Sequence, residues 1–520
     1  MSALVHVLRD TYLDSVVQLS GTRAMRVVEG VEWATAAMAT RANLATLEAE
    51  GFAPSQWSGA GAGDLILAVR ADSEDAAADA VQAGRDTMFS PRGDAGGSPA
   101  DAAPRTLQEA VDRQPGSSVA VISVPGEYAV LETHKALGAG LDVLLFSDNV
   151  PVAGEVELKE RAAGLGRLVM GPGAGTAMLG GICLGFANVV GDPDQRRGSV
   201  AVVAAAGTGA QEAAALLDRF GAGVALVIGL GGRDLSAAVG GPMGRLAVRS
   251  LAADPSVDAV LLVSKPPDPD VAATVLAEAG DTPLVATLIG LDCAGASEGD
   301  PRGVTRASTL EGGVLATLRR LGHPLPDTAQ GLSGQVENAI EALTDERTLV
   351  RGLFSGGTLC YESLVLLERA LGPVYSNTPI DTSHGLPAPE GSHVCLDLGE
   401  EEYTKGRPHP MIDPEARVEH LREQGEAGDV AVIVLDVVLG HGSHPDPASE
   451  LGPVCAEITG RGGPRIVVYV LGTEGDPQGF DRQRTAFADA GCVVTETAAR
   501  ASLAAAAIAL REPGLVGTAL

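Results

Sequence analysis

The sequence predicts an α/β protein made of several doubly wound parallel-sheet domains behind a small N-terminal α+β domain. Two observations predict this class. The length of 520 residues exceeds what one ordinary core supports, so three or four domains are expected. From residue 118 onward, unbroken apolar runs of strand length alternate with helical stretches, which is typical of parallel sheets covered on both faces.

Residues 1–87 have the pattern of the small α+β domain. We expect its strands at 5–8, 31–40 and 65–70, and its helices at 12–26, 41–50 and 73–87. The next stretch, 88–117, is rich in Pro, Gly, Ser and Asp, which predicts a linker with room for one short helix.

Three strand-and-helix units follow the linker, and we place them at 118–192, 198–330 and 345–520. The strands of the first two are apolar runs such as SVAVISV, LDVLLFS, SVAVVAAAG and VDAVLLVS. In the third unit we expect strands at 350–354, 394–398, 430–437, 465–471 and 492–495, and helices at 358–370, 414–423, 481–490 and 498–510. Because aromatics are only 3% and Gly totals 67, packing must depend on Ala, Val and Leu with close backbone approaches.

The charge balance limits the class of partner. Asp and Glu total 67 against 37 Lys and Arg, a net charge of −30, which argues against nucleic acid or an anionic membrane as partner. The apolar runs are too short to span a bilayer, and the N-terminus lacks the pattern of a signal peptide. Six Cys lie far apart without a C-x-x-C pair, as expected for reduced thiols. We therefore expect a cytoplasmic protein.

An internal repeat is the most informative feature. Gly207-Thr208, Glu212 and Leu216-Leu217 recur as Gly357-Thr358, Glu362 and Leu366-Leu367, offset by 150 positions each time. Both copies follow an apolar strand and open a helix, and the next apolar strands end in the segments 229–234 and 397–402. The alternative is a chance match between glycine-rich turns, but five matched positions favour duplication.

A Gly-Thr turn that opens a helix suits an anion. Its first amides lack helical partners, glycine permits close approach, and the helix dipole adds positive charge. A third glycine turn, 171–176, follows another strand, although it could be a plain tight turn. The candidate residues for binding phosphate or acyl phosphate are Gly207, Thr208, Gly209, Gln211, Gly356, Gly357, Thr358, Leu359, Gly171, Gly175 and Thr176.

Common signatures of other chemistries are missing. There is no G-x-G-x-x-G, no Walker A loop and no H-E-x-x-H. The G-x-S-x-G match at 295–299 runs into Asp300-Pro301 and not into a helix, which argues against a serine hydrolase. His441 and His444 could hold a metal, but two histidines in a coil more often cap a strand end, so we predict no metal.

Charged clusters supply the candidate catalytic and substrate-binding residues. Segment 405–413 holds Arg407, suited to a carboxylate or phosphate, His409, suited to proton transfer, and Asp413. The alternative is an exposed loop in which Asp413 merely starts a helix. Other candidates at strand ends, which could equally be surface ion pairs, are Lys265 as a catalytic residue and Arg233 and Asp234 as substrate ligands.

These motifs resemble the FdrA family over nearly the whole chain. The resemblance is carried by 147–149, 171–176, 186–188, 207–209, 229–234, 264–267, 356–359 and 406–413. FdrA is itself similar to succinyl-CoA ligase. The resemblance implies that 118–192 is a CoA-binding-like Rossmann unit, and that 198–330 and 345–520 are flavodoxin-like units of the ligase α and β types. It also implies that the helix starts at Gly207 and Gly357 aim at one phosphoryl group.

The chain departs from the ligase in two respects. The loop after strand 283–290 contains no His that could be phosphorylated, and no segment resembles the ligase's nucleotide-binding domain. FdrA proteins are also tied to an oxamate carbamoyltransferase, which converts oxalurate and phosphate into oxamate and carbamoyl phosphate and needs no nucleotide.

Three functions remain open at this point. The first is an acyl- or carbamoyl-transferring enzyme subunit that takes a small anionic metabolite and works in a homo-oligomer or hetero-complex. The second is an acyl-CoA synthetase that binds CoA near 124–126 and Ser147. The third is a non-catalytic scaffold subunit that senses an anion.

Overall fold

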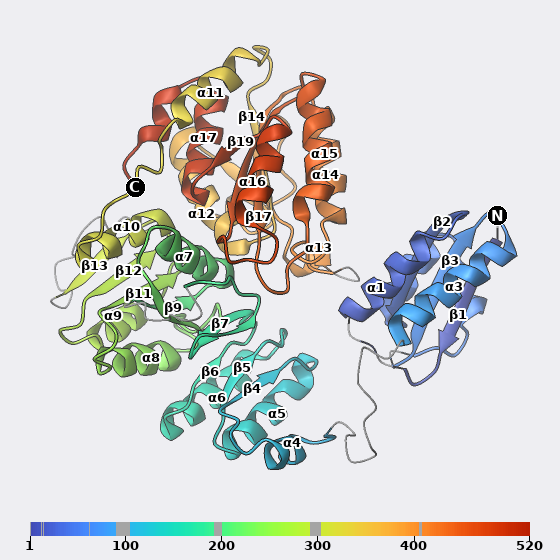
Figure 1. Cartoon of the computed structure of the whole chain (residues 1–520), viewed down its shortest axis with the longest axis horizontal. Coiled ribbons are helices and arrows are strands. Elements are labelled where there is room, and N and C mark those ends of the chain that lie inside the picture. The colour runs from blue at the N-terminus through green and yellow to red at the C-terminus, as the bar shows by residue number, and fades with distance from the viewer. Residues whose placement is uncertain are drawn as a thin grey trace. The chain divides into compact units, whose positions relative to one another are not determined.

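The computed structural model describes residues 2–520 except 12, 14, 62, 90–103, 192–199, 292–302 and 405–407. The chain divides into two compact units, drawn in Figure 1. The first holds Met1–Ala103 with Glu401–His409, and the second holds Pro104–Glu400 with Pro410–Leu520. The predicted class is confirmed: parallel α/β sheets accompany a small N-terminal α+β domain.

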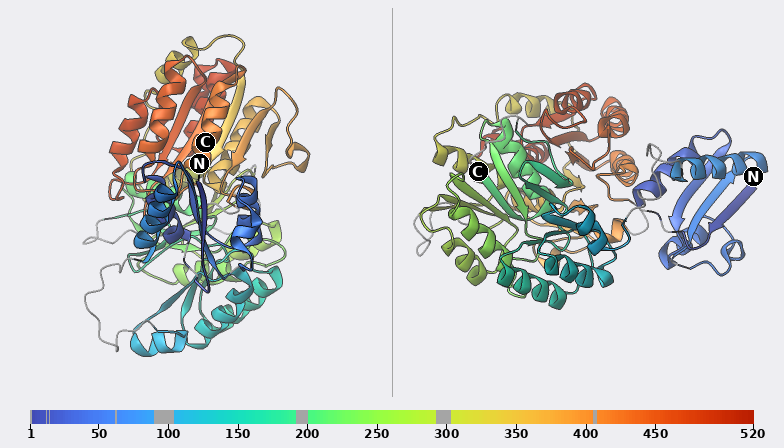
Figure 2. Two further views of the ribbon diagram at one scale, coloured as in Figure 1. Left: turned by 90° about the vertical axis from the view of Figure 1, so that its right-hand side faces the viewer. Right: turned by 60° about the horizontal axis from the view of Figure 1, so that its bottom comes forward.

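The first unit is a three-stranded antiparallel sheet in the order β1-β3-β2, with helices on both faces (Figure 2). One face packs against α1 and α3, and the other packs Trp33, Phe52 and Trp57 beside α2. The elements are β1 (Ser2–Leu8), α1 (Ser15–Arg26), β2 (Val31–Met38), α2 (Arg41–Ala49), η1 (Pro54–Trp57), β3 (Leu65–Ala71), α3 (Glu74–Phe89) and α13 (Glu401–Thr404).

The second unit begins with a Rossmann-like part, a parallel sheet in the order β4-β5-β6. Its elements are α4 (Leu107–Arg113), β4 (Val119–Ile122), α5 (Gly126–Gly138), β5 (Asp142–Leu145), α6 (Val152–Leu165) and β6 (Val169–Met170). The expected domain 118–192 is too long, because the hairpin of β7 (Thr176–Leu179) and β8 (Ile182–Gly185) joins the next sheet through Met178 and Val227. An apolar run alone does not tell which sheet a strand joins.

A seven-stranded sheet forms one half of the rest of the second unit, in the order β13-β12-β11-β9-β10-β7-β8. We call it the α-type half, after the ligase type that the resemblance implies for it. Its first five strands are parallel, β7 pairs antiparallel with β10, and β8 pairs antiparallel with β7. Its remaining elements are β9 (Val200–Ala205), α7 (Gly207–Arg219), β10 (Val224–Gly229), α8 (Pro242–Ala252), β11 (Ala259–Ser264), α9 (Pro269–Ala277), β12 (Leu284–Leu288), β13 (Val304–Ala307) and α10 (Leu310–Leu321). The next helix, α11 (Leu332–Glu341), packs against helices of the six-stranded sheet described next.

A six-stranded parallel sheet forms the other half, in the order β15-β16-β14-β17-β18-β19. We call it the β-type half, again after the ligase type that the resemblance implies. Its strands are β14 (Leu349–Phe354), β15 (Val374–Ser376), β16 (His393–Asp397), β17 (Val430–Val438), β18 (Arg465–Leu471) and β19 (Val493–Thr495). Its helices are α12 (Gly357–Leu371), η3 (Thr382–His384), α14 (Glu415–Glu426), α15 (Pro447–Gly460), α16 (Phe480–Asp489), α17 (Ala498–Leu510) and η4 (Pro513–Gly517).

Two helices of this half show what sequence patterns do and do not predict. The apolar run at 501–510 forms most of α17, whose residues 498–509 are all buried. Helix α15 is absent from the helices predicted above. Pro447 is the first helical residue, where the missing N–H costs nothing, and Pro453 is accommodated inside the helix.

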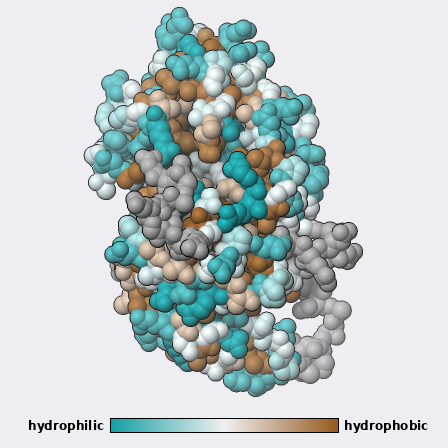
Figure 3. Space-filling view, turned by 90° about the vertical axis from the view of Figure 1, so that its left-hand side faces the viewer, coloured by the Kyte–Doolittle hydropathy of each residue, from teal (hydrophilic) through white to brown (hydrophobic). Residues whose placement is uncertain are grey.

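No helix in the described ranges combines the length and apolarity needed to cross a membrane. On the face shown in Figure 3, hydrophilic and hydrophobic residues are interspersed.

A buried ion network joins the Rossmann-like part to the seven-stranded sheet. Lys159 of α6 is fully buried, and its Nζ donates to Glu155 Oε1 at 2.8 Å, Asp234 Oδ1 at 2.9 Å and the Leu230 carbonyl at 2.9 Å. Arg233 Nε donates to Glu155 Oε2 at 2.8 Å. Lys159 therefore compensates two carboxylates that have no access to water.

We predict that Lys159→Met lowers the free energy of unfolding by ~3–5 kcal/mol, because it leaves the buried Asp234 without a counter-charge. The control is Lys135→Met. Its side chain is 52% exposed and pairs with Glu132, so the loss should stay below ~1 kcal/mol. Urea titration of both variants measures the difference, and equal small losses would contradict the buried network.

Candidate functional site at the meeting of two helix starts

Two helices of the second unit begin in contact with each other, one from each half. Helix α7 opens after β9, and α12 opens after β14, and both strands lie inside their sheets. The amide of Thr358 donates a hydrogen bond to Thr208 Oγ1 at 3.3 Å, and both threonines are buried. The expected convergence of the two repeated turns is therefore present in the structure. We call this contact and its surroundings the junction.

Two glycines allow the helices to approach this closely. A Cβ on Gly209 would lie 2.9 Å from Thr358 Cγ2, and one on Gly356 would lie 2.7 Å from Thr208 Cγ2. Both distances are shorter than real side chains tolerate. A Cβ on Gly207 would meet nothing within 4 Å, and Gly207 is exposed. The junction is therefore tight on one side and open to solvent at Gly207.

Backbone amides converge at the junction. The first intrahelical hydrogen bonds run from Ala210 N to the Ala206 carbonyl and from Cys360 N to the Gly356 carbonyl, so earlier amides have no helical partner. Thr358 uses its amide on Thr208. Within the described part of the chain, amides with no recorded partner remain at Gly207, Thr208, Gly209, Gly357 and Leu359. Both helix dipoles add positive charge there.

An internal carboxylate already occupies part of the α12 start. Asp436 of β17 accepts hydrogen bonds from Ser355 N at 2.7 Å and Gly356 N at 2.8 Å. Its charge is balanced by Arg417, whose Nη2 lies 3.2 Å from Asp436 Oδ1, and both side chains are buried. The predicted ligand donor Gly356 therefore bonds to the protein itself.

Asp397, at the end of β16, is a carboxyl at the junction that the sequence analysis did not single out. Its Oδ2 lies 2.5 Å from where a Cβ on Gly357 would stand. Burial raises the pKa of Asp397 to about 6, against the opposing field of Lys265. A carboxyl with a pKa near neutrality can both accept and release a proton. The sequence signals were its place at the end of an apolar strand and at the start of the repeated segment 397–402.

Lys265 brings a positive charge to the junction from the α-type half. It follows β11, and its Nζ lies 5.5 Å from the ring centroid of Tyr361 on α12. The field of its ammonium group lowers the pKa of Asp397. Lys265 is partly exposed and so remains accessible to a ligand.

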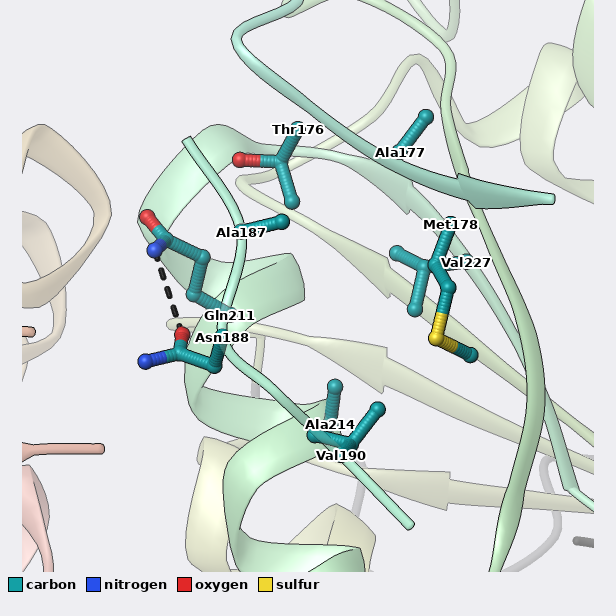
Figure 4. A pocket seen from close by; sticks show the side chains of 9 residues that line it. All are labelled: Thr176, Ala177, Met178, Ala187, Asn188, Val190, Gln211, Ala214 and Val227. Atoms are coloured by element: carbon teal, nitrogen blue, oxygen red, sulfur yellow. Dashed lines mark hydrogen bonds between the residues drawn. The ribbon is translucent and has the colours of Figure 1, made fainter. Parts of the chain in front are cut away.

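Gln211 lines a small pocket (Figure 4). Its Nε2 donates to Asn188 Oδ1 at 3.1 Å, and Asn188 Nδ2 donates to Asp476 Oδ2 at 2.7 Å and to the Leu439 carbonyl at 3.0 Å. The pocket has about 230 Å³ of empty space, part of it open solvent, and is lined by Thr176, Ala177, Met178, Ala187, Asn188, Val190, Gln211, Ala214 and Val227. Gln211 thus belongs to a polar chain that joins the two halves.

The glycine turn 171–176 lies at the carboxyl end of β6 and serves packing. A Cβ on Gly171, whose φ is +116°, would lie 2.2 Å from the Leu145 carbonyl oxygen. The carbonyl of Gly175 accepts a hydrogen bond from Phe186 N at 2.6 Å, and Thr176 Oγ1 donates to the Phe186 carbonyl at 2.7 Å. Ligand binding by this turn stays a prediction.

The predicted substrate residues lie outside the junction. Arg233 and Asp234 belong to the Lys159 network, in which Asp234 Oδ2 also accepts from Gly244 N at 2.8 Å. Asp413 Oδ1 accepts from Glu415 N at 3.0 Å at the start of α14, which matches the alternative structural role.

The remaining polar candidates stay predictions. Arg407 lies outside the described residues, and His409 belongs to the first unit. In the histidine loop, His444 Nδ1 accepts from Asp446 N at 3.2 Å. The residues described contain no group of three side chains suited to a metal ion.

We predict that Gly209→Ala lowers the free energy of unfolding by ~1–3 kcal/mol, because its Cβ forces Thr358 away. Gly207→Ala in the same helical turn is the control, and its stability should be unchanged or slightly higher because the space around it is open. Urea titration compares the two. Equal stability of both variants would show that the helix starts do not meet as described.

Comparisons with known proteins agree with the ligase-like architecture. A family model described as CoA-ligase matches residues 353–508, and one described as "AllF, heavy metal-associated domain" matches residues 1–104. The uncharacterised protein YahF of Escherichia coli K12 is 36% identical over 523 residues, which cover 97% of this chain and 98% of YahF.

Two solved structures are more distant. ATP citrate lyase from Methanothrix soehngenii, solved with citrate and coenzyme A, is 20% identical with a TM-score of 0.31, and the match covers 43% of this chain and 38% of the lyase. A dinucleotide-forming acetyl-coenzyme A synthetase of Candidatus Korarchaeum cryptofilum is 14% identical with a TM-score of 0.28, covering 77% of this chain and 84% of its own. These similarities are too weak to bear on the site.

The heavy-metal description does not fit the residues of the first unit. All six cysteines of the chain lie at position 183 or later, so residues 1–104 contain no thiolate ligand. His6 is the one histidine of that stretch, and burial together with the charge of Arg85 lowers its pKa. We derive no metal chemistry for this unit.

The similarity to YahF extends over almost the entire chain, and the two family models match its ends. The chain carries a CoA-ligase-type domain at residues 353–508 and belongs to the FdrA family.

Proposed function

We propose that this chain is an enzyme subunit that transfers an acyl group, of the carbamoyl type, to or from phosphate at the junction. The observation that supports this most directly is the 3.3 Å contact between Thr208 and Thr358, which points two helix starts at one place. Phosphate binds readily where several backbone amides and helix dipoles converge. The amides of Gly207, Gly209 and Gly357 are the proposed donors.

The charges around the junction favour a bound anion. Lys265 contributes one full positive charge and the two helix starts contribute roughly half a charge each. The buried charge of Asp436 is cancelled by Arg417. Asp397 is a carboxyl at the junction whose negative charge opposes an anion, as does the charge of the nearby Glu400. Because its pKa is about 6, Asp397 loses this charge by taking up a proton. The net field is therefore positive below pH 6 and weaker above it.

The proposed reaction balances without a nucleotide. A phosphate oxygen forms a bond to the carbamoyl carbon of oxalurate while the bond from that carbon to the oxamate nitrogen breaks. The proton lost by phosphate goes to the leaving nitrogen, and the products are carbamoyl phosphate and oxamate. Asp397 accepts and returns this proton, while the amides and Lys265 stabilise charge on the phosphoryl oxygens. Arg407 as the partner of the oxamate carboxylate stays a prediction from the sequence.

The match of residues 353–508 to the CoA-ligase model supports a second candidate, an acyl-CoA synthetase-like activity. In that case CoA would bind to the Rossmann-like part, near Gly126 and Ser147. A Cβ on Gly126 would lie 2.3 Å from the Asp148 carbonyl oxygen, so this turn packs closely against the segment that follows β5. His409 and partner subunits of a hetero-complex remain proposed participants in either reaction.

The two candidates differ in what they consume. Purified full-length protein is incubated with oxalurate and phosphate, alone and with the products of neighbouring genes, and carbamoyl phosphate is measured. Calorimetry with CoA tests the second candidate. Carbamoyl phosphate without CoA supports the first proposal. Heat of CoA binding together with absence of carbamoyl phosphate in every combination would reject it in favour of the second.

We predict that Lys265→Met weakens phosphate binding by roughly tenfold or more, because a charge-assisted hydrogen bond is lost. The control Lys135→Met removes an exposed lysine of the Rossmann-like part and should leave the affinity unchanged. Isothermal titration with phosphate measures both. Equal affinities of the two variants would place the anion elsewhere.

We also predict that anion affinity falls as pH rises through 6. Sulfate is the appropriate probe, because its own charge is constant from pH 5 to 8. The wild type should lose roughly tenfold in affinity over this range as Asp397 ionises. Asp397→Asn should bind equally well throughout and more tightly than wild type at pH 8. The exposed Asp489→Asn is the control and should keep the wild-type slope. A slope unchanged by Asp397→Asn would contradict the assignment.

A further inference from the structure

The two glutamates of the internal repeat form reciprocal bonds between the halves. Glu212 of α7, in the α-type half, accepts a hydrogen bond from Ala498 N at 3.4 Å, and Ala498 is the first residue of α17 in the β-type half. Glu362 of α12, in the β-type half, accepts from Leu310 N at 2.6 Å, and Leu310 is the first residue of α10 in the α-type half. Each repeated helix thus holds the start of a helix in the opposite half.

The two target helices begin in the same way. Thr309 accepts from Gly312 N at 3.0 Å, and Thr497 accepts from Arg500 N at 3.1 Å, so each threonine caps the third amide of its helix. The glutamate from the other half takes the first amide. A helix start needs several hydrogen-bond acceptors, and the threonine supplies only one. Each fully buried glutamate therefore has a backbone amide to bond.

A third glutamate uses the nearby buried cation. Arg500 donates to Glu311 Oε1 through Nη2 at 2.6 Å and through Nε at 3.1 Å. Glu311 Oε2 accepts from Thr497 Oγ1 at 2.5 Å, and Oε1 accepts from Thr328 Oγ1 at 2.7 Å. The positive charge of Arg500 is therefore committed to Glu311 and does not balance Glu212 or Glu362.

The surroundings of the two repeated glutamates disfavour a negative charge. Glu362 Oε2 is buried with no hydrogen-bond partner among the described residues, and it lies in the fields of Glu212 and Glu311. Glu212 Oε2 bonds to the hydroxyl of Tyr469 on β18. The charge of Arg219 on α7 acts on Glu212 at a distance, whereas its guanidinium group pairs with Glu496.

We propose that Glu212 and Glu362 are positioning residues that hold the α7 and α12 starts in register as neutral carboxyl groups. A neutral carboxyl still accepts the amide hydrogen bond through one oxygen, and it avoids the cost of an unpaired buried charge. The two starts in question are those of the junction, and each glutamate follows the first residue of its helix by five positions. The duplicated Gly-Thr-x-x-x-Glu pattern thus joins an anion-facing turn to the side chain that orients it.

The proton balance gives the sign of the pH effect. Burial raises the pKa of Glu212 to about 7 and that of Glu362 to about 8, both above the ordinary value of 4.5. Between pH 4.5 and 8 the folded chain therefore binds more protons at these sites than the unfolded chain does. The stability contribution of both groups is present at low pH and is lost as pH rises through 7 and 8.

The test compares the wild type with Glu212→Gln, Glu362→Gln and the double Gln variant from pH 5 to 9. Glutamine keeps the amide acceptor and cannot ionise. We expect equal unfolding midpoints near pH 5 and an advantage of the double variant that grows toward pH 8.5. Glu311→Gln is the control, because it leaves Arg500 buried without a counter-charge and should lower the midpoint at every pH.

Hydrogen exchange gives a second measurement, which reports whether Glu362 holds the helix starts in place. The amides of Leu310 and Thr358 should exchange roughly tenfold faster in Glu362→Ala, which has no acceptor, and at the wild-type rate in Glu362→Gln. Gln variants as unstable as Glu311→Gln, or a midpoint difference that does not change with pH, would overturn the proposal. The inference rests on the junction of the proposed function, but neither readout needs an anion, so failure to bind phosphate would overturn only the proposed function.

Discussion

The contact between Thr208 Oγ1 and the Thr358 amide is the constraint on which the second unit depends. It requires two interior strands from different sheets to end at one place, and it requires glycine at 209 and 356. The reciprocal glutamates, the Asn188 chain and the Arg500 network all tie the same two halves together. Much of the buried polar chemistry of this unit therefore serves to hold two helix starts face to face.

Such an arrangement is suited to a ligand that carries negative charge. Two dipoles act from different directions, which a single helix start does not provide, and Lys265 adds a charge from a third element. Backbone amides without partners destabilise the fold. Asp436 removes part of this cost, because it accepts hydrogen bonds from two amides of the turn before α12. The open side at Gly207 leaves the rest of the amides for a ligand. The protein's overall charge of −30 does not prevent this, because the local field is set by nearby groups.

Much of this architecture could be predicted from local sequence. Apolar runs predicted the central strands, and the Gly-Thr repeat predicted both helix starts and their convergence, because duplicated units tend to pack symmetrically. The features that could not be predicted from the sequence also have a physical explanation. Asp397, Asp436 and the glutamate acceptors gain their roles from partners far away in sequence, which no local pattern encodes. The β7–β8 hairpin and α15 were not predicted, because the pairing of Met178 with Val227 and the packing around Pro453 depend on contacts distant in sequence.

The central claim is that the two helix starts share one anion. The most direct test is a crystal of the full-length chain soaked with arsenate, a phosphate analogue that gives an anomalous signal. The account predicts a peak about 3 Å from the amides of Gly207, Gly209 and Gly357, on the side of Lys265. A peak elsewhere, with none at the junction at concentrations that saturate binding in solution, would contradict it.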